Sequence, residues 1–197
     1  MDWLELVAAL VSVAAVWLTV LRRVVSCPVG IVSVILYAWV FIAARLYSDA
    51  LLQGIFGVMI VYSWVYWKRH LDAGARVVVV PLARRSAVIH VLLGVACALA
   101  LGYAMHRFTN AALPWLDSAL TAFSLVAQWW QARRHVAAWW LWIIVDVIYV
   151  GEYVYKRLDI TSVLYAGFVV LAVLGLRHWQ RARDTAAPAT AAVRTGG

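Results

Sequence analysis

Charged residues are scarce in this sequence. Lys, Arg, Asp and Glu make up 13% of its 197 residues, whereas hydrophobic residues make up 66%. An average soluble domain is about one quarter charged, and the surface of a soluble domain of this size needs far more polar sequence than is present. The scarcity excludes an ordinary soluble domain and indicates a protein whose surface lies in lipid.

Residues suited to metal, redox and nucleotide chemistry are also few. The two cysteines, Cys27 and Cys97, stand in no metal or redox spacing and are interpreted as packing residues. The five histidines form no metal or haem pair, and the sequence contains no phosphate-binding loop, HExxH or GxSxG motif. We therefore expect no cofactor, no metal site and no catalytic residue, and the sequence predicts that the chain is not an enzyme.

The hydrophobic residues are gathered in seven blocks of roughly 17–20 residues, the length that a helix needs to cross a bilayer. The start of the chain lacks a basic leader, so the first block is predicted to be retained as a helix. A tail rich in Ala, Thr and Gly, at 184–197, is predicted to be disordered. The sequence predicts an all-α integral membrane protein with transmembrane helices at about 3–20, 28–45, 49–67, 86–105, 115–132, 138–155 and 160–177.

Basic residues fall mainly on one side of the predicted membrane. In a soluble protein the net charge of +8 would indicate a nucleic-acid partner, but membrane topology explains it here and no nucleic-acid partner is expected. Because Lys and Arg favour the cytoplasmic side, we predict an outside N-terminus and a cytoplasmic C-terminus in the inner (plasma) membrane. Most of the 17 basic residues then lie inside, namely Arg22, Arg23, Lys68, Arg69, Arg76, Arg84, Arg85, Arg133, Arg134, Arg177, Arg181, Arg183 and Arg194; Arg45, Arg107, Lys156 and Arg157 lie outside.

The chain resembles itself at a constant offset of 112 residues. Matching pairs occur in three successive helices, and topology alone does not explain a shared offset. The pairs include Trp3 with Trp115, Ser12 with Ser124, Arg22 with Arg134, Tyr37 with Tyr149, Arg45 with Arg157, and Trp67 with Trp179.

The repeat predicts a 3+1+3 organisation. Residues 1–70 form one three-helix unit, 113–183 form the second, and 71–112 hold a basic cytoplasmic loop and a linker helix. The odd crossing lets both units start on the same side, so the two bundles are parallel. Transporters are built in this way, with the substrate site near the membrane midplane between the halves.

Polar and aromatic residues recur at helical spacing on the predicted inner faces. Tryptophan is abundant, with 12 copies. We expect Trp3, Trp67, Trp115 and Trp179 at membrane interfaces, and other aromatic residues around a ligand, where Trp67 is also placed. The candidate substrate-binding residues are Tyr37, Gln53, Trp64, Trp67, Ser124, Gln128, Trp139, Trp142, Asp146 and Tyr149.

Asp146 is the most informative of these candidates. It lies near the middle of a predicted helix, where a carboxylate is expensive unless it is paired, solvated or protonated. An aromatic cage with one carboxylate suits a flat organic cation, although a neutral Asp that hydrogen-bonds between helices would also fit. Its repeat equivalent is Val34, and that of Gln128 is Val16, so the predicted site is asymmetric.

With these residues assigned, the chain resembles the PnuC family of vitamin transporters over nearly its whole length. The resemblance rests on the helix count, on Gln128, and on the run from Trp139 through Asp146 to Tyr149. It is also carried by Leu46-Tyr47-Ser48-Asp49-Ala50-Leu51-Leu52-Gln53, Tyr62-Ser63-Trp64-Val65-Tyr66-Trp67 and Leu158-Asp159-Ile160-Thr161-Ser162-Val163-Leu164-Tyr165.

The resemblance implies a SWEET-like fold and facilitated diffusion of nicotinamide riboside, which a cytoplasmic kinase then traps. It also implies a homotrimer in contact with membrane lipid. Two alternatives stay open at this point: a thiamine or riboflavin transporter of the same family, and a proton-coupled carrier that uses Asp146. A non-transport membrane protein, such as a haem-binding or scaffolding subunit, is a third reading.

Overall fold

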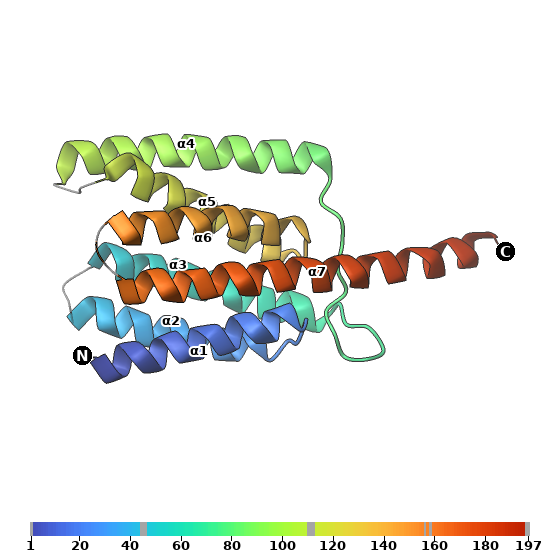
Figure 1. Cartoon of the computed structure of the whole chain (residues 1–197). Coiled ribbons are helices and arrows are strands. Elements are labelled where there is room, and N and C mark those ends of the chain that lie inside the picture. Colours follow the sequence, from blue (N-terminus) through green and yellow to red (C-terminus); the bar gives the residue numbers. More distant parts are fainter. Residues whose placement is uncertain (1, 44–46, 110–112, 156, 158, 196–197) are drawn as a thin grey trace.

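The computed structural model describes residues 2–43, 47–109, 113–155, 157 and 159–195, and this part of the chain is an all-helical bundle (Figure 1). The predicted positions of Arg45, Leu46, Lys156 and Leu158 lie outside the described residues. The helices are α1 (Asp2–Val20), α2 (Ser26–Ala43), α3 (Tyr47–Lys68), α4 (Arg84–Phe108), α5 (Pro114–Ala132), α6 (Ala137–Tyr155) and α7 (Asp159–Thr195). The predicted helix count is confirmed for the described residues.

Six of these helices are long and apolar enough to cross a membrane, and α5 is the exception. Its sequence holds Asp117, Gln128 and Gln131, which lower its hydropathy. Yet α5 contacts three other helices, α3, α4 and α6, and much of its surface is buried. The polar residues of α5 are therefore accommodated inside the bundle. A seventh membrane crossing in α5 stays a prediction.

Six helices close into a ring. The packed pairs are α1 with α2, α2 with α3, α3 with α5, α5 with α6, α6 with α7, and α7 with α1, while α4 packs on α5 alone. Figure 1 shows α4 at the edge of the bundle, beside α5. Exchanging α1–α3 with α5–α7 leaves the ring pattern unchanged, and α4 has no counterpart.

The connection between α3 and α4 folds over one end of the bundle, which we call the basic end. Isolated bridges pair Leu71 with Val77 and Val80 with His135. The Val77 N–H donates to the Arg22 carbonyl at 2.9 Å, and the Val80 N–H donates to the Arg134 carbonyl at 3.1 Å. One segment thus binds the α1–α2 turn and the α5–α6 turn together.

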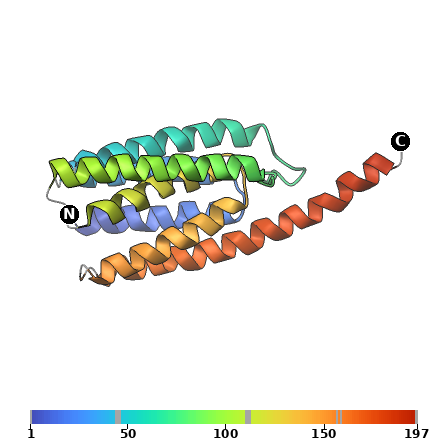
Figure 2. The same cartoon turned by 90° about the horizontal axis from the view of Figure 1, so that it is seen from above.

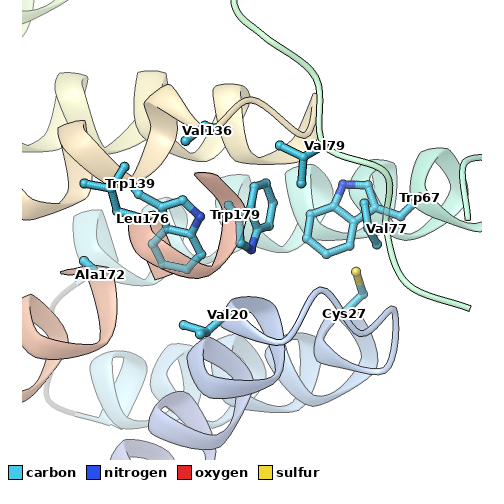
Figure 3. Close-up of a cluster of buried hydrophobic side chains, with 10 residues drawn as sticks. All are labelled: Val20, Cys27, Trp67, Val77, Val79, Val136, Trp139, Ala172, Leu176 and Trp179. Carbon is cyan, nitrogen blue, oxygen red and sulfur yellow. The ribbon is translucent and has the colours of Figure 1, made fainter. Parts of the chain in front are cut away.

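The largest buried cluster lies next to this connection (Figure 3). Three indoles stand in a row, with Trp179 between Trp67 and Trp139. Gly175 makes the row possible, since a Cβ atom there would come within 2.6 Å of the Trp139 ring. The cluster consists of Val20, Cys27, Trp67, Val77, Val79, Val136, Trp139, Ala172, Leu176 and Trp179.

The C-terminal segment differs from the prediction. A disordered tail was expected at 184–197, but α7 continues as a helix to Thr195 and projects beyond the bundle (Figure 2). The reason is local, because alanine is the strongest helix former and the segment is rich in it.

Candidate substrate site

Asp146 is buried at the midpoint of α6, with 6% of its surface exposed. Among the described residues, no side chain donates a hydrogen bond to its carboxylate and no basic group forms an ion pair with it. An isolated carboxylate at this depth costs at least about 2.5 kcal/mol. A carboxylate whose burial costs this much free energy, with no such hydrogen bond or ion pair to offset it, is a candidate for the centre of a binding site.

Three tyrosines on α6 and α7 lie on the side of Asp146 away from the basic end. The ring centroids of Tyr149 and Tyr165 are 4.9 Å apart, those of Tyr153 and Tyr165 5.0 Å, and those of Tyr149 and Tyr153 5.7 Å. Asp146 and Tyr165 are close enough to interact electrostatically. Tyr149 is three residues from Asp146 on α6 and so shares a helix face with it, and Tyr165 of α7, which sequence reasoning missed, lies next to both. The only available signal was its place at the end of the family-like run.

The Tyr149 hydroxyl is close enough to Ser124 of α5 to interact with its hydroxyl. In the first half, Tyr37 is close to Ser12 of α1 in the same way. The Ser12 Oγ also meets the Ser33 Oγ at 2.5 Å. Ser124 and Tyr37 stay candidates for the site, and Ser12 and Ser33 are further candidates through these contacts.

Closer to the basic end, α5 and α6 are joined by a polar contact. The Trp142 Nε1–H donates to the Gln131 Oε1 at 2.6 Å. Gln128 lies one turn beyond Ser124 on α5 and is partly buried. Trp142 packs against the cluster that holds the indole row, and Gln128 stays a candidate for the interior.

Trp67 and Trp139 lie in the closed core, with 2% and 1% of their surfaces exposed. The expectation of an interface position is wrong for Trp67 and Trp179, which are buried because their indole N–H groups reach backbone carbonyls across the ring. Trp3 and Trp115 are exposed, as an interface residue requires. The Trp139 Nε1 is buried without an acceptor in the described part of the chain.

Trp64 and Gln53 are separated from each other along α3. The Lys68 ammonium lies over the Trp64 ring at 4.4 Å, near the basic end. Gln53 is eleven residues earlier in the same helix, which is about 16 Å away at the helical rise. The structure therefore does not bring these two candidates into one contact surface.

The basic end is closed by electrostatic as well as apolar contacts. The Arg22 guanidinium pairs with Asp72 at 3.5 Å, while burial lowers the pKa of Arg22. Hydrogen bonds from the N–H groups of Arg76 and Gly74, with help from Arg22, hold the pKa of Asp72 below its ordinary value. Arg134 donates to the Val78 carbonyl at 2.8 Å. Passage of a substrate through this end requires these contacts to part.

Two shallow grooves open on the outer surface of the molecule. One is lined by residues of α5 and α6, including Leu116 and Ile148, and the other by residues of α1 and α7, including Val13 and Leu171. Asp146 lines neither groove.

An all-helical membrane bundle with a buried polar centre and a closed basic end defines a class, the small-molecule transporters. The family model for the nicotinamide mononucleotide transporter matches residues 2–181. The chain therefore belongs to the nicotinamide mononucleotide transporter family, and the predicted resemblance is confirmed.

Curated relatives agree with this assignment. The nicotinamide riboside transporter PnuC of Escherichia coli is 26% identical over 91% of this chain and 85% of its own length. The PnuC of Neisseria mucosa is 23% identical over 91% of this chain and 73% of its own. The riboflavin/roseoflavin transporter RibM of Streptomyces davaonensis is 25% identical, over 90% and 84%.

The fold also matches a solved structure. The crystal structure of the vitamin B3 transporter PnuC superposes with a TM-score of 0.78 at 23% sequence identity, and the match covers 93% of this chain and 83% of that one. The all-helical membrane architecture is therefore shared with that protein.

Proposed function

We propose that this protein carries nicotinamide riboside across the inner (plasma) membrane by facilitated diffusion. The observation that carries the proposal is Asp146, a buried carboxylate without a partner among the described residues, next to tyrosine rings. Nicotinamide riboside joins a flat cationic ring to a sugar. A carboxylate with aromatic faces suits such a ring through charge pairing and cation–π attraction. The names of the PnuC relatives support the same ligand.

The proposed architecture is two parallel three-helix bundles, 1–70 and 113–183, joined through α4 in a 3+1+3, SWEET-like arrangement. Its support is the ring of contacts, which is unchanged when the two halves are exchanged. The N-terminus lies outside and the C-terminus in the cytoplasm, because the basic end carries most of the Lys and Arg residues. Transport then requires the two bundles to rock around the central site.

The site residues divide by depth. Asp146 pairs with the cation, and Tyr149 and Trp142 supply aromatic faces. Ser124 and Gln128 on α5 supply hydrogen bonds. Gln53 lies toward the outer end and meets the substrate on entry, and Tyr37 lies deeper, beside Ser12 of α1. The remaining candidates, Trp64, Trp67 and Trp139, form the wall that separates the site from the cytoplasm.

Facilitated diffusion accumulates nothing by itself, so net uptake requires the product to be removed. A cytoplasmic kinase that phosphorylates the riboside would trap it, because the added charge prevents return through the same site. The resemblance to PnuC also leads us to propose a homotrimer in membrane lipid. The α4 helix, which packs only on α5, offers an apolar face for lipid or for another copy.

Proteoliposomes test the transport proposal. Labelled nicotinamide riboside should equilibrate into vesicles that hold the purified protein, without ATP and without an imposed pH gradient. Asp146→Ala and Gln128→Ala should reduce both binding and uptake by about tenfold or more, while both variants still insert. Asp184→Asn, which removes an exposed carboxylate on α7, is the matched control. Failure of the riboside to equilibrate would overturn the proposal.

Riboflavin is the second candidate substrate, because RibM is among the relatives. Riboflavin is neutral, so its transport should be insensitive to Asp146→Asn. Thiamine is cationic and should respond as nicotinamide riboside does. Uptake that follows an imposed pH gradient and loses this dependence in Asp146→Asn would instead support a proton-coupled carrier.

A further inference from the structure

The two halves of the protein contain the same serine–tyrosine pair. Ser12 with Tyr37 joins α1 to α2, and Ser124 with Tyr149 joins α5 to α6. Each member of one pair is 112 residues from its counterpart in the other. Descent of the two halves from a common ancestor therefore explains why both contain the pair. The residues that differ around each pair then indicate how the roles of the two halves differ.

The residue beside each pair differs in charge. In the first half it is Ser33, which is 5% exposed and meets Ser12 at 2.5 Å. In the second half it is Asp146, which is 6% exposed and bonds to no described residue. The equivalents of these two residues are Val145 and Val34. One half is thus polar and neutral, and the other carries the only carboxylate at this depth in the described residues.

The two groups belong to helices that stand opposite each other in the ring. In the order α1, α2, α3, α5, α6, α7, the helix opposite α1 is α5 and the helix opposite α2 is α6. Ser12, Ser33, Ser124 and Asp146 all lie near the midpoints of their helices. Tyr37 is also close enough to Tyr153 of α6 to interact with it electrostatically. The neutral hydroxyls and the carboxylate therefore lie at similar depth on helices that stand on opposite sides of the ring.

We propose that Ser12, Ser33 and Tyr37 form a second subsite, which binds the hydroxyl groups of a sugar while Asp146 binds the cationic ring. This inference rests on the proposed function and gives the substrate an orientation. Hydroxyl groups both donate and accept hydrogen bonds, so three of them match the mixed donors and acceptors of a polyol. In the first half the equivalent of Asp146 is the apolar Val34, so this half carries no negative charge at that position. A cation is therefore attracted to the second half.

The proposal separates the two parts of the ligand, and three probes test it. Nicotinamide riboside carries both the charge and the sugar. Dihydronicotinamide riboside keeps the sugar and lacks the charge, and 1-methylnicotinamide keeps the charge and lacks the sugar. Dissociation constants from tryptophan quenching should be measured for wild type, Ser33→Ala, Tyr37→Phe and Asp146→Asn.

Ser33→Ala and Tyr37→Phe should each weaken both ribosides, by roughly three- to tenfold, and leave 1-methylnicotinamide unchanged. Asp146→Asn should weaken both cations and leave the dihydro compound unchanged. Ser63→Ala is the matched control, because Ser63 is a buried serine whose hydroxyl bonds only to the Met59 carbonyl of its own helix. It should change none of the three constants.

Ser33 and Ser12 could alternatively serve helix packing alone. Ser33→Ala and Tyr37→Phe would then lower the unfolding temperature and bind all three probes as wild type does, which would overturn the subsite. Equal weakening of all three probes would overturn it as well. Wild type that binds none of the probes would reject the proposed function itself, a result distinct from a failure of the subsite.

Discussion

Trp67 and Trp179 meet edge to face at the basic end, with ring centroids 6.1 Å apart and planes at 60°. The Trp67 Nε1–H donates to the Ala132 carbonyl at 2.9 Å, and the Trp179 Nε1–H donates to the Thr19 carbonyl at 3.0 Å. These bonds join α3 to α5 and α7 to α1, which are the two places where one half of the ring meets the other. Opening the basic end therefore breaks both bonds.

Removal of one indole N–H should loosen this end. Trp67→Phe is expected to lower the free energy of unfolding by about 1–3 kcal/mol, because it removes a buried hydrogen bond and leaves a gap. Cys27 reports the change directly, since its thiol is 4% exposed within the same cluster. In a Cys97→Ala background, a thiol reagent should label Cys27 faster in Trp67→Phe. Trp140→Phe, at a site 55% exposed, should label at the wild-type rate.

Gly175 is required by the packing of Trp139. Gly175→Ala should destabilise the protein by about 1–3 kcal/mol, because the new methyl group would lie 2.6 Å from the indole within a filled cluster. Gly167→Ala, on the same helix, meets no atom within 4 Å and should leave the thermal unfolding midpoint nearly unchanged. Equal midpoints for the two variants would contradict the packing of the indole row.

Arg22 and Arg134 adopt left-handed backbone conformations, with φ of 59° and 68°, and bind the α3–α4 connection. Arg134→Ala loses the hydrogen bond from Arg134 to Val78 and keeps the backbone strain. Arg134→Gly loses the bond and relieves the strain, which is worth about 1 kcal/mol. The glycine variant should therefore unfold at a higher temperature than the alanine variant. The reverse order would show that the conformation is not strained.

Stability should fall at mildly acidic pH through His135. Burial lowers the pKa of His135 below its ordinary value of 6.5, and Arg133 and Arg134 lower it further. The unfolded chain then takes up a proton more readily than the folded one, so the stability present above pH 6.5 declines as the pH falls below it. Thermal unfolding between pH 7.5 and 5.5 should show this decline. His135→Asn should flatten it, whereas His106→Asn, at the opposite end, should retain the wild-type slope.

Much of the helical pattern could be predicted from the sequence alone. The blocks of apolar residues predict the helices because a bilayer admits backbone only in hydrogen-bonded form. Ser12 matches Ser124 and Arg22 matches Arg134 at the constant offset of 112 residues, so both matches can be found in the sequence alone. The structure shows each pair making equivalent contacts. The disorder predicted from composition after residue 184 differs from the helix in the structure. Alanine favours a helix there whether or not the segment packs against other helices.

The candidate site was only partly predictable. Asp146 stands out in any hydropathy reading because its burial is expensive. Trp67 does not stand out, because the sequence does not show whether a tryptophan near a helix end faces lipid or fills the interior of the bundle. Tyr165 was missed for a similar reason, because α7 offers no polar stripe to mark which of its faces turns inward.

The sequence by itself determined that this is a membrane protein of helices, with halves that match at a constant offset and one carboxylate near the middle of a predicted helix, because each of these follows from residue type and spacing along the chain. Only the tertiary structure decided that the indoles of Trp67 and Trp179 close the basic end and that the helices of Ser33 and Asp146 stand opposite each other in the ring. Those relationships depend on which helices become neighbours in the ring. Helix rotation and packing set them, and residues more than 100 positions apart in the chain leave no local signal of their contact.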